Sequence, residues 1–83
     1  MSAPNDELLK AVELALAGDW DAVHQLVQQH ESDATAAWIH AVLHKIEGDS
    51  GNARYWYRRA GRLDQVAEEP RAELAAIPAE LRL

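Results

Sequence analysis

Three glycines divide the chain, and each follows a segment whose apolar residues recur at helical spacing. Gly18, Gly48 and Gly61 stand where those segments end, and glycine readily takes the left-handed conformation that closes a helix. The connections after them are so short that neighbouring helices are expected to run antiparallel. The glycine spacing therefore predicts an all-α chain of antiparallel helical hairpins.

Apolar residues indicate four helices, grouped as a first hairpin over 5–30 and a second hairpin over 33–61. The first helix is expected over 5–17, and the second is expected to end near residue 30. Each helix carries one apolar stripe for a shared core. The stripes are Leu8, Leu9, Val12, Ala15 and Leu16; Trp20, Val23, His24 and Val27; Ile39, Val42, Leu43 and Ile46; and Ala53, Trp56, Tyr57 and Ala60.

Residues with short polar side chains precede three of these helices and favour their starts. Asp19 is expected to cap the second helix. Ser32 and Asp33 are alternative caps for the third helix, and Asp49 and Ser50 are alternative first residues of the fourth.

The tail over 64–83 is expected to cap the hairpins, so that 1–83 forms one domain. A helical turn is expected within 64–69, followed by a helix from Pro70 that Pro78 ends after Ile77. One kinked helix is the alternative. The residues expected to dock the tail on the hairpins are Leu74, Ile77 and Leu81.

Composition excludes several classes of function. Fourteen acidic against eight basic residues give a net charge of −6, which argues against nucleic-acid binding through phosphate contacts. The absence of cysteine excludes disulfides and thiolate metal sites. No apolar run approaches the length of about 20 residues that spans a membrane. We expect a soluble, cytoplasmic protein without a nucleic-acid or membrane partner.

A short pattern recurs in the two hairpins. Gly18-Asp19 and Gly48-Asp49 lie 30 residues apart, and Ala22 and Ala53 follow them inside the next helix. This spacing predicts two degenerate helix-turn-helix repeats.

The second hairpin resembles tetratricopeptide-type repeats, particularly the Sel-one-like variety, through Gly48-Asp49, Ala53 and the run over 56–60. Residues 40–60, which read HAxLHxxEGDxxNAxYWYRRA, also resemble a small microbial family of tetratricopeptide-like proteins. In the first hairpin only Gly18-Asp19 and Ala22 match. The resemblance implies a helical module that presents a surface to a protein or peptide partner, and it implies no activity.

Two histidines lie one helical turn apart in the third helix. His40, His44 and Glu47 share one side of that helix at i, i+4 and i+7. The zinc-protease motif needs Glu immediately after the first histidine, and Ala41 stands there. His24 on the second helix is the candidate for a third ligand. The sequence thus offers a metal site of His24, His40 and His44, with hydrogen-bonded histidines in a helix interface as the alternative.

A symmetric second hairpin would place its polar side chains in pairs. In that register His44 lies opposite Tyr55, His40 lies opposite Arg59, and Glu47 lies opposite Asn52. The candidate ligand- or partner-binding residues are His40, His44, Glu47, Asn52, Tyr55, Arg58 and Arg59.

Four arginines fall within nine residues of an otherwise acidic chain: Arg54, Arg58, Arg59 and Arg62. Arginines at i and i+4 present their guanidinium groups on one side of a helix and can grip a carboxylate or phosphate. The alternative is pairing within the protein. The acids considered for it are Glu47, Asp49, Asp64 and Glu68.

The three tryptophans fall on three successive helices, at Trp20, Trp38 and Trp56. Large aromatic side chains in a small domain are expected in the core. Trp38 lies off the main stripe of its helix, so contact with the first helix, a groove or a subunit interface are alternatives for it.

No phosphate-binding glycine loop or nucleophile motif is present, so we do not expect a conventional enzyme or a cofactor. The interpretation we favour from the sequence is a module that binds a protein, a peptide or another copy of itself. The alternative is a small-ligand or metal-binding protein that uses the histidine cluster.

Overall fold

The computed structural model describes residues 5–81, so residues 1–4 and 82–83 of the expected domain lie outside the described part. All regular structure within 5–81 is helical, which confirms the all-α prediction. The elements are α1 (Asn5–Leu16), α2 (Trp20–Gln28), α3 (Ala34–Ile46), α4 (Ser50–Ala60), the 3-10 helix η1 (Leu63–Gln65) and α5 (Pro70–Leu81).

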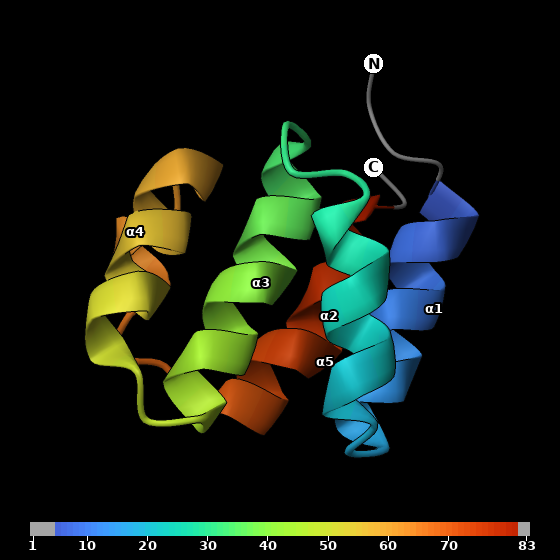
Figure 1. Ribbon diagram of the computed structural model, residues 1–83, viewed down its shortest axis with the longest axis horizontal. Coiled ribbons are helices and arrows are strands. Elements are labelled where there is room, and N and C mark those ends of the chain that lie inside the picture. Colours follow the sequence, from blue (N-terminus) through green and yellow to red (C-terminus); the bar gives the residue numbers. More distant parts are fainter. Residues whose placement is uncertain (1–4, 82–83) are drawn as a thin grey trace.

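The first four helices stand side by side, and the chain reverses direction from each to the next (Figure 1). Helix α3 packs extensively on α4 and also contacts α2. Helix α5 lies behind α2 and α3 in the view of Figure 1 and packs on α1 and α3. Because α3 contacts helices on several sides, it is the central element of the fold.

Local sequence explains where the helices begin and end. Gly48 closes α3 with φ 82°, a left-handed conformation that costs glycine little. Asp33 caps α3 by accepting a hydrogen bond from the Ala36 amide at 2.9 Å. Asp49 caps α4 and accepts a bond of 2.7 Å from the Asn52 side chain. Asp33 and Asp49, rather than the neighbouring serines, are therefore the N-caps.

The core is continuous from α1 to α5 and consists mainly of aliphatic side chains. Full burial of one such side chain contributes about 1.5–3 kcal/mol, so these residues carry the stability of the fold. The buried apolar residues are Leu8, Ala11, Val12, Ala15, Val23, Val27, Ala36, Ala37, Trp38, Ile39, Ala41, Val42, Leu43, Ala53, Tyr57, Leu74 and Ile77.

The tail departs from the expected boundary. Helix α5 continues through Pro78 to Leu81, so the prediction that Pro78 ends the helix after Ile77 is wrong. Proline removes one backbone donor, but here it falls in the last turn, and burial of Leu74 and Ile77 holds the helix on the core. Leu81 packs against the same core. The predicted docking of the tail through these three residues is confirmed.

A buried carboxylate joins α5 to α3 and α4. The Glu73 side chain is fully buried and accepts hydrogen bonds from Trp38 Nε1 at 2.6 Å and the Tyr57 hydroxyl at 2.7 and 2.8 Å. Lys45 Nζ lies 2.6 Å from Oε1 of Glu73, an oxygen that also accepts from Tyr57. Burial and the bond to Glu73 raise the pKa of Tyr57, so its hydroxyl stays a donor. Trp38 is thus a core residue, as expected, and its polar partner Glu73 lies on α5.

Candidate metal centre

Three histidines from two helices meet at one place. His24 projects from α2, and His40 and His44 project from successive turns of α3. One ring nitrogen from each residue lies within 4.8 Å of the other two. The ring centroids of His40 and His44 are 5.0 Å apart, and those of His24 and His40 are 4.8 Å apart. The structure therefore brings together the three residues that the sequence analysis named as a metal site.

The closest contact in this cluster joins two nitrogens of the same kind. Nε2 of His24 lies 3.0 Å from Nε2 of His40, and Gln28 Nε2 lies 3.4 Å from the same His24 atom. A hydrogen bond between two neutral imidazoles needs one of these nitrogens to carry the proton. A metal ion can take the place of that proton, because both nitrogens then offer a lone pair.

His44 has acidic neighbours. Its Nδ1 lies 3.4 Å from Glu47 Oε1 and 3.7 Å from Asp49 Oδ2, while the same nitrogen is buried and makes no hydrogen bond within residues 5–81. Ligating histidines commonly direct their second ring nitrogen at a carboxylate, which orients the ring and raises its basicity. Glu47 and Asp49 are placed for that role if His44 binds a metal through Nε2.

His40 is the most enclosed of the three. Its side chain is stacked on Trp56 of α4, with centroids 4.0 Å apart and ring planes 20° apart. Burial, together with the neighbouring rings of His24 and His44, lowers the pKa of His40 to about 4. The ring is therefore neutral at physiological pH, which is the form that binds metals.

The spacing of the ligand atoms suits a transition metal after a small movement. Zinc–nitrogen bonds of about 2.0–2.1 Å in a tetrahedron correspond to nitrogen–nitrogen distances of about 3.3–3.4 Å. The 3.0 Å pair of His24 and His40 is near that value. The widest separation between ligand nitrogens is at most 4.8 Å. It must shorten by about 1.4 Å to reach the tetrahedral distance, and rotation of the side chains can supply that movement.

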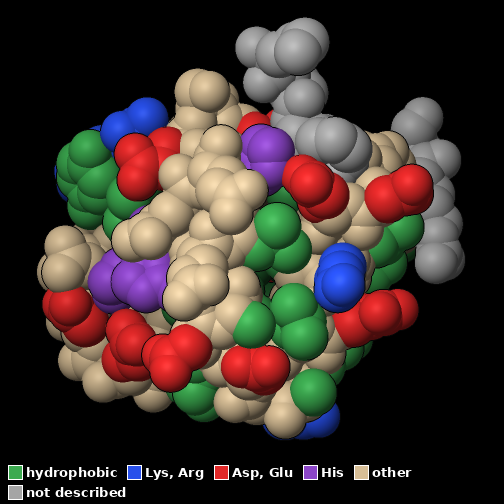
Figure 2. Space-filling view, turned by 45° about the vertical axis from the view of Figure 1, so that its right-hand side comes forward, with side chains coloured by type: hydrophobic (Ala, Val, Ile, Leu, Met, Phe, Trp, Pro, Cys, Tyr) green, Lys and Arg blue, Asp and Glu red, His purple; other side chains and the backbone are tan. Residues whose placement is uncertain are grey.

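The cluster reaches the surface. Figure 2 shows histidine side chains gathered on one face of the molecule, with acidic side chains next to them. His24 and His44 are partly exposed, whereas His40 is buried. The fourth histidine, His30, does not join the cluster and contacts Glu7 Oε2 at 2.6 Å. It is a natural control for the other three.

Two of the expected pairings across the second hairpin are wrong. His40 contacts Trp56 rather than Arg59, because Trp56, one helical turn before Arg59, faces α3. Asn52 donates to Asp49, the N-cap of α4, rather than to Glu47. A side chain in the first turn of a helix lies close to the capping residue of that helix. Tyr55, expected opposite His44, is half exposed and accepts a hydrogen bond from Arg59 Nη1 at 3.1 Å.

The arginines divide into two groups. Arg59 lies 5.1 Å from the centroid of Trp56 and donates to the Glu31 carbonyl. Arg62 lies 4.3 Å from the ring centroid of Trp38 and pairs with Glu80, an acid that the sequence analysis did not consider. Arg54 and Arg58 are exposed and form no ion pair with any residue in 5–81. Internal pairing therefore accounts for only part of the positive charge.

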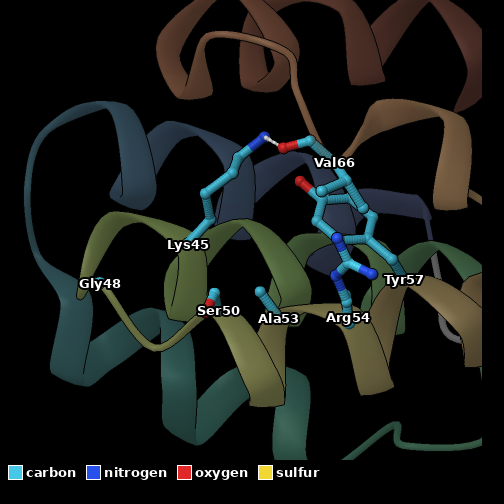
Figure 3. Close-up of a pocket in the computed structure, with 7 residues that line it drawn as sticks. All are labelled: Lys45, Gly48, Ser50, Ala53, Arg54, Tyr57 and Val66. Atoms are coloured by element: carbon cyan, nitrogen blue, oxygen red, sulfur yellow. Dashed lines mark hydrogen bonds between the residues drawn. The ribbon is translucent and has the colours of Figure 1, made fainter.

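A pocket of about 210 Å³ lies between the end of α3, the start of α4 and Val66 (Figure 3). Arg54 and Lys45 line it, but Lys45 Nζ already donates to the carbonyls of Val66 and Glu68 and to Glu73. No histidine lines this pocket, so it is separate from the histidine cluster.

Sequence reasoning missed three residues around the cluster. The sequence predicts Trp56 as a core residue, whereas its ring also stacks on the ring of His40. Gln28 was not considered, although it lies four residues after His24 and therefore on the same side of α2. Asp49 was recognised as a helix cap and not as a neighbour of His44. Helical spacing was able to identify Gln28, whereas the other two contacts depend on how α4 packs.

Comparisons with protein families, curated proteins and solved structures return no match for this chain. The tetratricopeptide-like interpretation therefore stays a prediction. None of the helices within residues 5–81 has the length and hydropathy that membrane crossing requires.

Proposed function

We propose that this protein binds a divalent transition-metal ion through His24, His40 and His44. The observation that carries the proposal is the convergence of one nitrogen from each residue to within 4.8 Å. The three residues come from two helices, and α3 alone supplies two of them one turn apart.

The donor set defines the class of metal. Imidazole nitrogens favour zinc, copper(II) and nickel(II), whereas magnesium and calcium prefer oxygen ligands. The carboxylates of Glu47 and Asp49 lie beside the cluster, and the chain carries a net charge of −6. Both features attract a cation to this face. They also offset the positive charge of the ion, which three neutral ligands leave uncompensated.

Calorimetric titration of the full chain with zinc chloride tests this proposal. We expect one zinc ion per chain with a dissociation constant of about 1 μM, which corresponds to a binding free energy of about −8 kcal/mol. His24→Ala and His44→Ala should each weaken binding at least about tenfold, because each removes one of three ligands. His30→Ala is the matched control and should bind zinc as the unchanged chain does.

Loss of the fold must be separated from loss of the site. His40 is buried, so we place the test on the partly exposed His24 and His44 and record helical circular dichroism for each variant. Folded His24→Ala and His44→Ala variants that bind zinc as tightly as the unchanged chain would refute the proposal. The cluster would then be a hydrogen-bonded interface between α2 and α3.

A second candidate function rests on a different surface. Arg54 and Arg58 lie at i and i+4 on the exposed side of α4 and have no ion-pair partner within the described residues, although acids outnumber bases. This supports a module that binds an acidic segment of a partner protein or peptide.

Fluorescence anisotropy with a labelled peptide rich in Asp and Glu tests the second candidate. We expect Arg54→Ala with Arg58→Ala to weaken binding by about tenfold, because two solvent-exposed ion pairs contribute about 0.2–1 kcal/mol each. The double variant Arg62→Ala with Arg71→Ala removes the same charge elsewhere. Equal weakening by both double variants would reduce the effect to net charge and count against a defined surface.

A further inference from the structure

We propose that the metal ion held by His24, His40 and His44 keeps a fourth position open to solvent and there activates water for the hydrolysis of small neutral esters. The inference rests on the metal-binding function proposed above and assigns a reaction to that site.

The number and charge of the ligands lead to this activity. Zinc sites with three protein ligands and one water are characteristic of catalysis, whereas structural sites have four protein ligands. Three neutral imidazoles leave the full double charge on the ion. That charge polarises a bound water strongly enough to form hydroxide near neutral pH.

The direction of the open position follows from burial. Trp56 covers one face of His40, and His40 is 4% exposed, so solvent does not reach the ion from that side. His24 is partly exposed, and Gln28 beside it is exposed. Solvent therefore reaches the ion from α2, on the surface where Figure 2 shows histidine side chains.

Gln28 is the side chain placed to act on the fourth ligand. Its Nε2 lies 3.4 Å from Nε2 of His24, the atom that would bind the ion. A neutral amide is a weak zinc ligand but a good hydrogen-bond donor. We assign Gln28 the role of a positioning residue that donates to the oxygen atom on the metal.

The surroundings limit the substrate. Glu47 and Asp49 lie beside His44 and repel anionic substrates. The pocket of Figure 3 is lined by other residues, so it contributes no wall to this site. Small uncharged esters therefore fit best, and the rate should rise linearly with their concentration because little of the substrate is enclosed.

The reaction balances without a further reagent. The metal-bound hydroxide oxygen attacks the ester carbonyl carbon, a new carbon–oxygen bond forms, and the carbonyl electron pair moves onto its oxygen. That pair returns as the carbon–oxygen bond to the leaving group breaks, which gives a carboxylic acid and an alkoxide. The acid ionises to a carboxylate and a proton, and the alkoxide takes up a proton to become the alcohol. A second water fills the fourth position and releases a proton to solvent. Ester and water thus yield carboxylate, alcohol and one proton.

Hydrolysis of 4-nitrophenyl acetate by the zinc-loaded full chain is the direct test. We expect a second-order rate constant at least about tenfold above that of the same zinc concentration with His44→Ala, as metal-generated hydroxide requires. His30→Ala should retain the activity. Binding of azide to the cobalt(II)-loaded protein, seen as a change in the visible absorption, reports the open position independently of activity.

Gln28 variants separate an open position from a filled one. Gln28→Glu supplies a carboxylate as a fourth ligand, so we expect tighter zinc binding, loss of hydrolysis and no effect of azide. Gln28→Ala should retain zinc affinity and lower the rate about threefold to tenfold, which is the loss expected for one hydrogen bond.

Failure of this inference differs from failure of metal binding. If the chain binds zinc but neither hydrolyses the ester nor responds to azide, the open fourth position is wrong and the metal site stands. If zinc does not bind in calorimetry, both proposals are wrong. Unchanged hydrolysis in His44→Ala would assign the activity to another part of the molecule and overturn the inference.

Discussion

The indole ring of Trp56 lies on the imidazole ring of His40, with centroids 4.0 Å apart and ring planes 20° apart. This contact joins α4 to the histidine cluster on α2 and α3. A metal bound by His40 would therefore lie close to one of the three tryptophans in the chain.

Copper(II) should quench tryptophan fluorescence through this contact. Copper(II) binds imidazole sites more tightly than zinc and quenches nearby indole emission. We expect stoichiometric copper to quench the unchanged chain strongly and Trp56→Phe only weakly, because Trp20 and Trp38 are outside the ring contacts of the cluster. Equal fractional quenching in the two proteins would contradict a metal beside His40.

Neutralising Glu73 should destabilise the fold. Glu73→Gln keeps the shape of the side chain but leaves Lys45, which lies 2.6 Å from Oε1, without its buried counter-charge. Breaking a buried ion pair typically costs about 3–5 kcal/mol, and urea unfolding should show a loss of that order. Glu80→Gln is the control, because its pair with Arg62 is partly exposed and should cost less than about 1 kcal/mol.

Two glycines should respond oppositely to the same substitution. Gly48 has φ 82°, so Gly48→Ala should destabilise the chain by about 1–2 kcal/mol through left-handed strain. Gly51 lies in α4, and an added Cβ there has no atom within 4 Å. Gly51→Ala should stabilise the chain by up to about 1 kcal/mol. Thermal unfolding measures both changes, and shifts of the same sign would contradict this explanation.

Acidification should weaken the metal-free protein. The pKa of His40 is lowered from 6.5 to about 4 by burial and by the rings of His24 and His44, so the folded state favours the neutral ring. The stability linked to this group is complete above about pH 6.5 and is lost as the pH falls toward 4. One pKa unit corresponds to about 1.4 kcal/mol, so the fall from 6.5 to about 4 sets an upper value of about 3.5 kcal/mol for the loss of stability.

The comparison that isolates this group is His40→Gln with a chelator present. Other ionisable side chains lie close to the three rings, namely those of Glu47 and Asp49 beside His44 and those of His24 and His44 beside His40. Urea unfolding at pH 7 and pH 4.5 should therefore show a smaller pH dependence in the variant than in the unchanged chain. An equal dependence would assign the acid sensitivity to other residues.

The sequence predicted the helices better than it predicted their contacts. Gly48 and Asp49 determine a boundary through backbone geometry and capping, which are local properties. The predicted helix end at Pro78 is wrong, because the effect of a proline depends on where its helix is buried. The ion pair of Lys45 and Glu73 joins positions 28 residues apart, so no local pattern revealed it.

The histidine site shows the same division. The spacing on one helix groups His40 with His44, and the expected contact between α2 and α3 adds His24. The predicted register across the second hairpin failed for His40 and Arg59, because Trp56 and not Arg59 turns toward α3. Side-chain packing between helices decides such contacts, and helical periodicity alone does not specify it.

X-ray absorption at the zinc edge of the loaded full chain tests the metal site most directly. The proposed site predicts three imidazole nitrogens at about 2.0–2.1 Å and one oxygen ligand from water. The spectrum of His44→Ala should show one imidazole fewer. A spectrum with one imidazole or none, or a spectrum unchanged in His44→Ala, would show that these three histidines do not hold the metal.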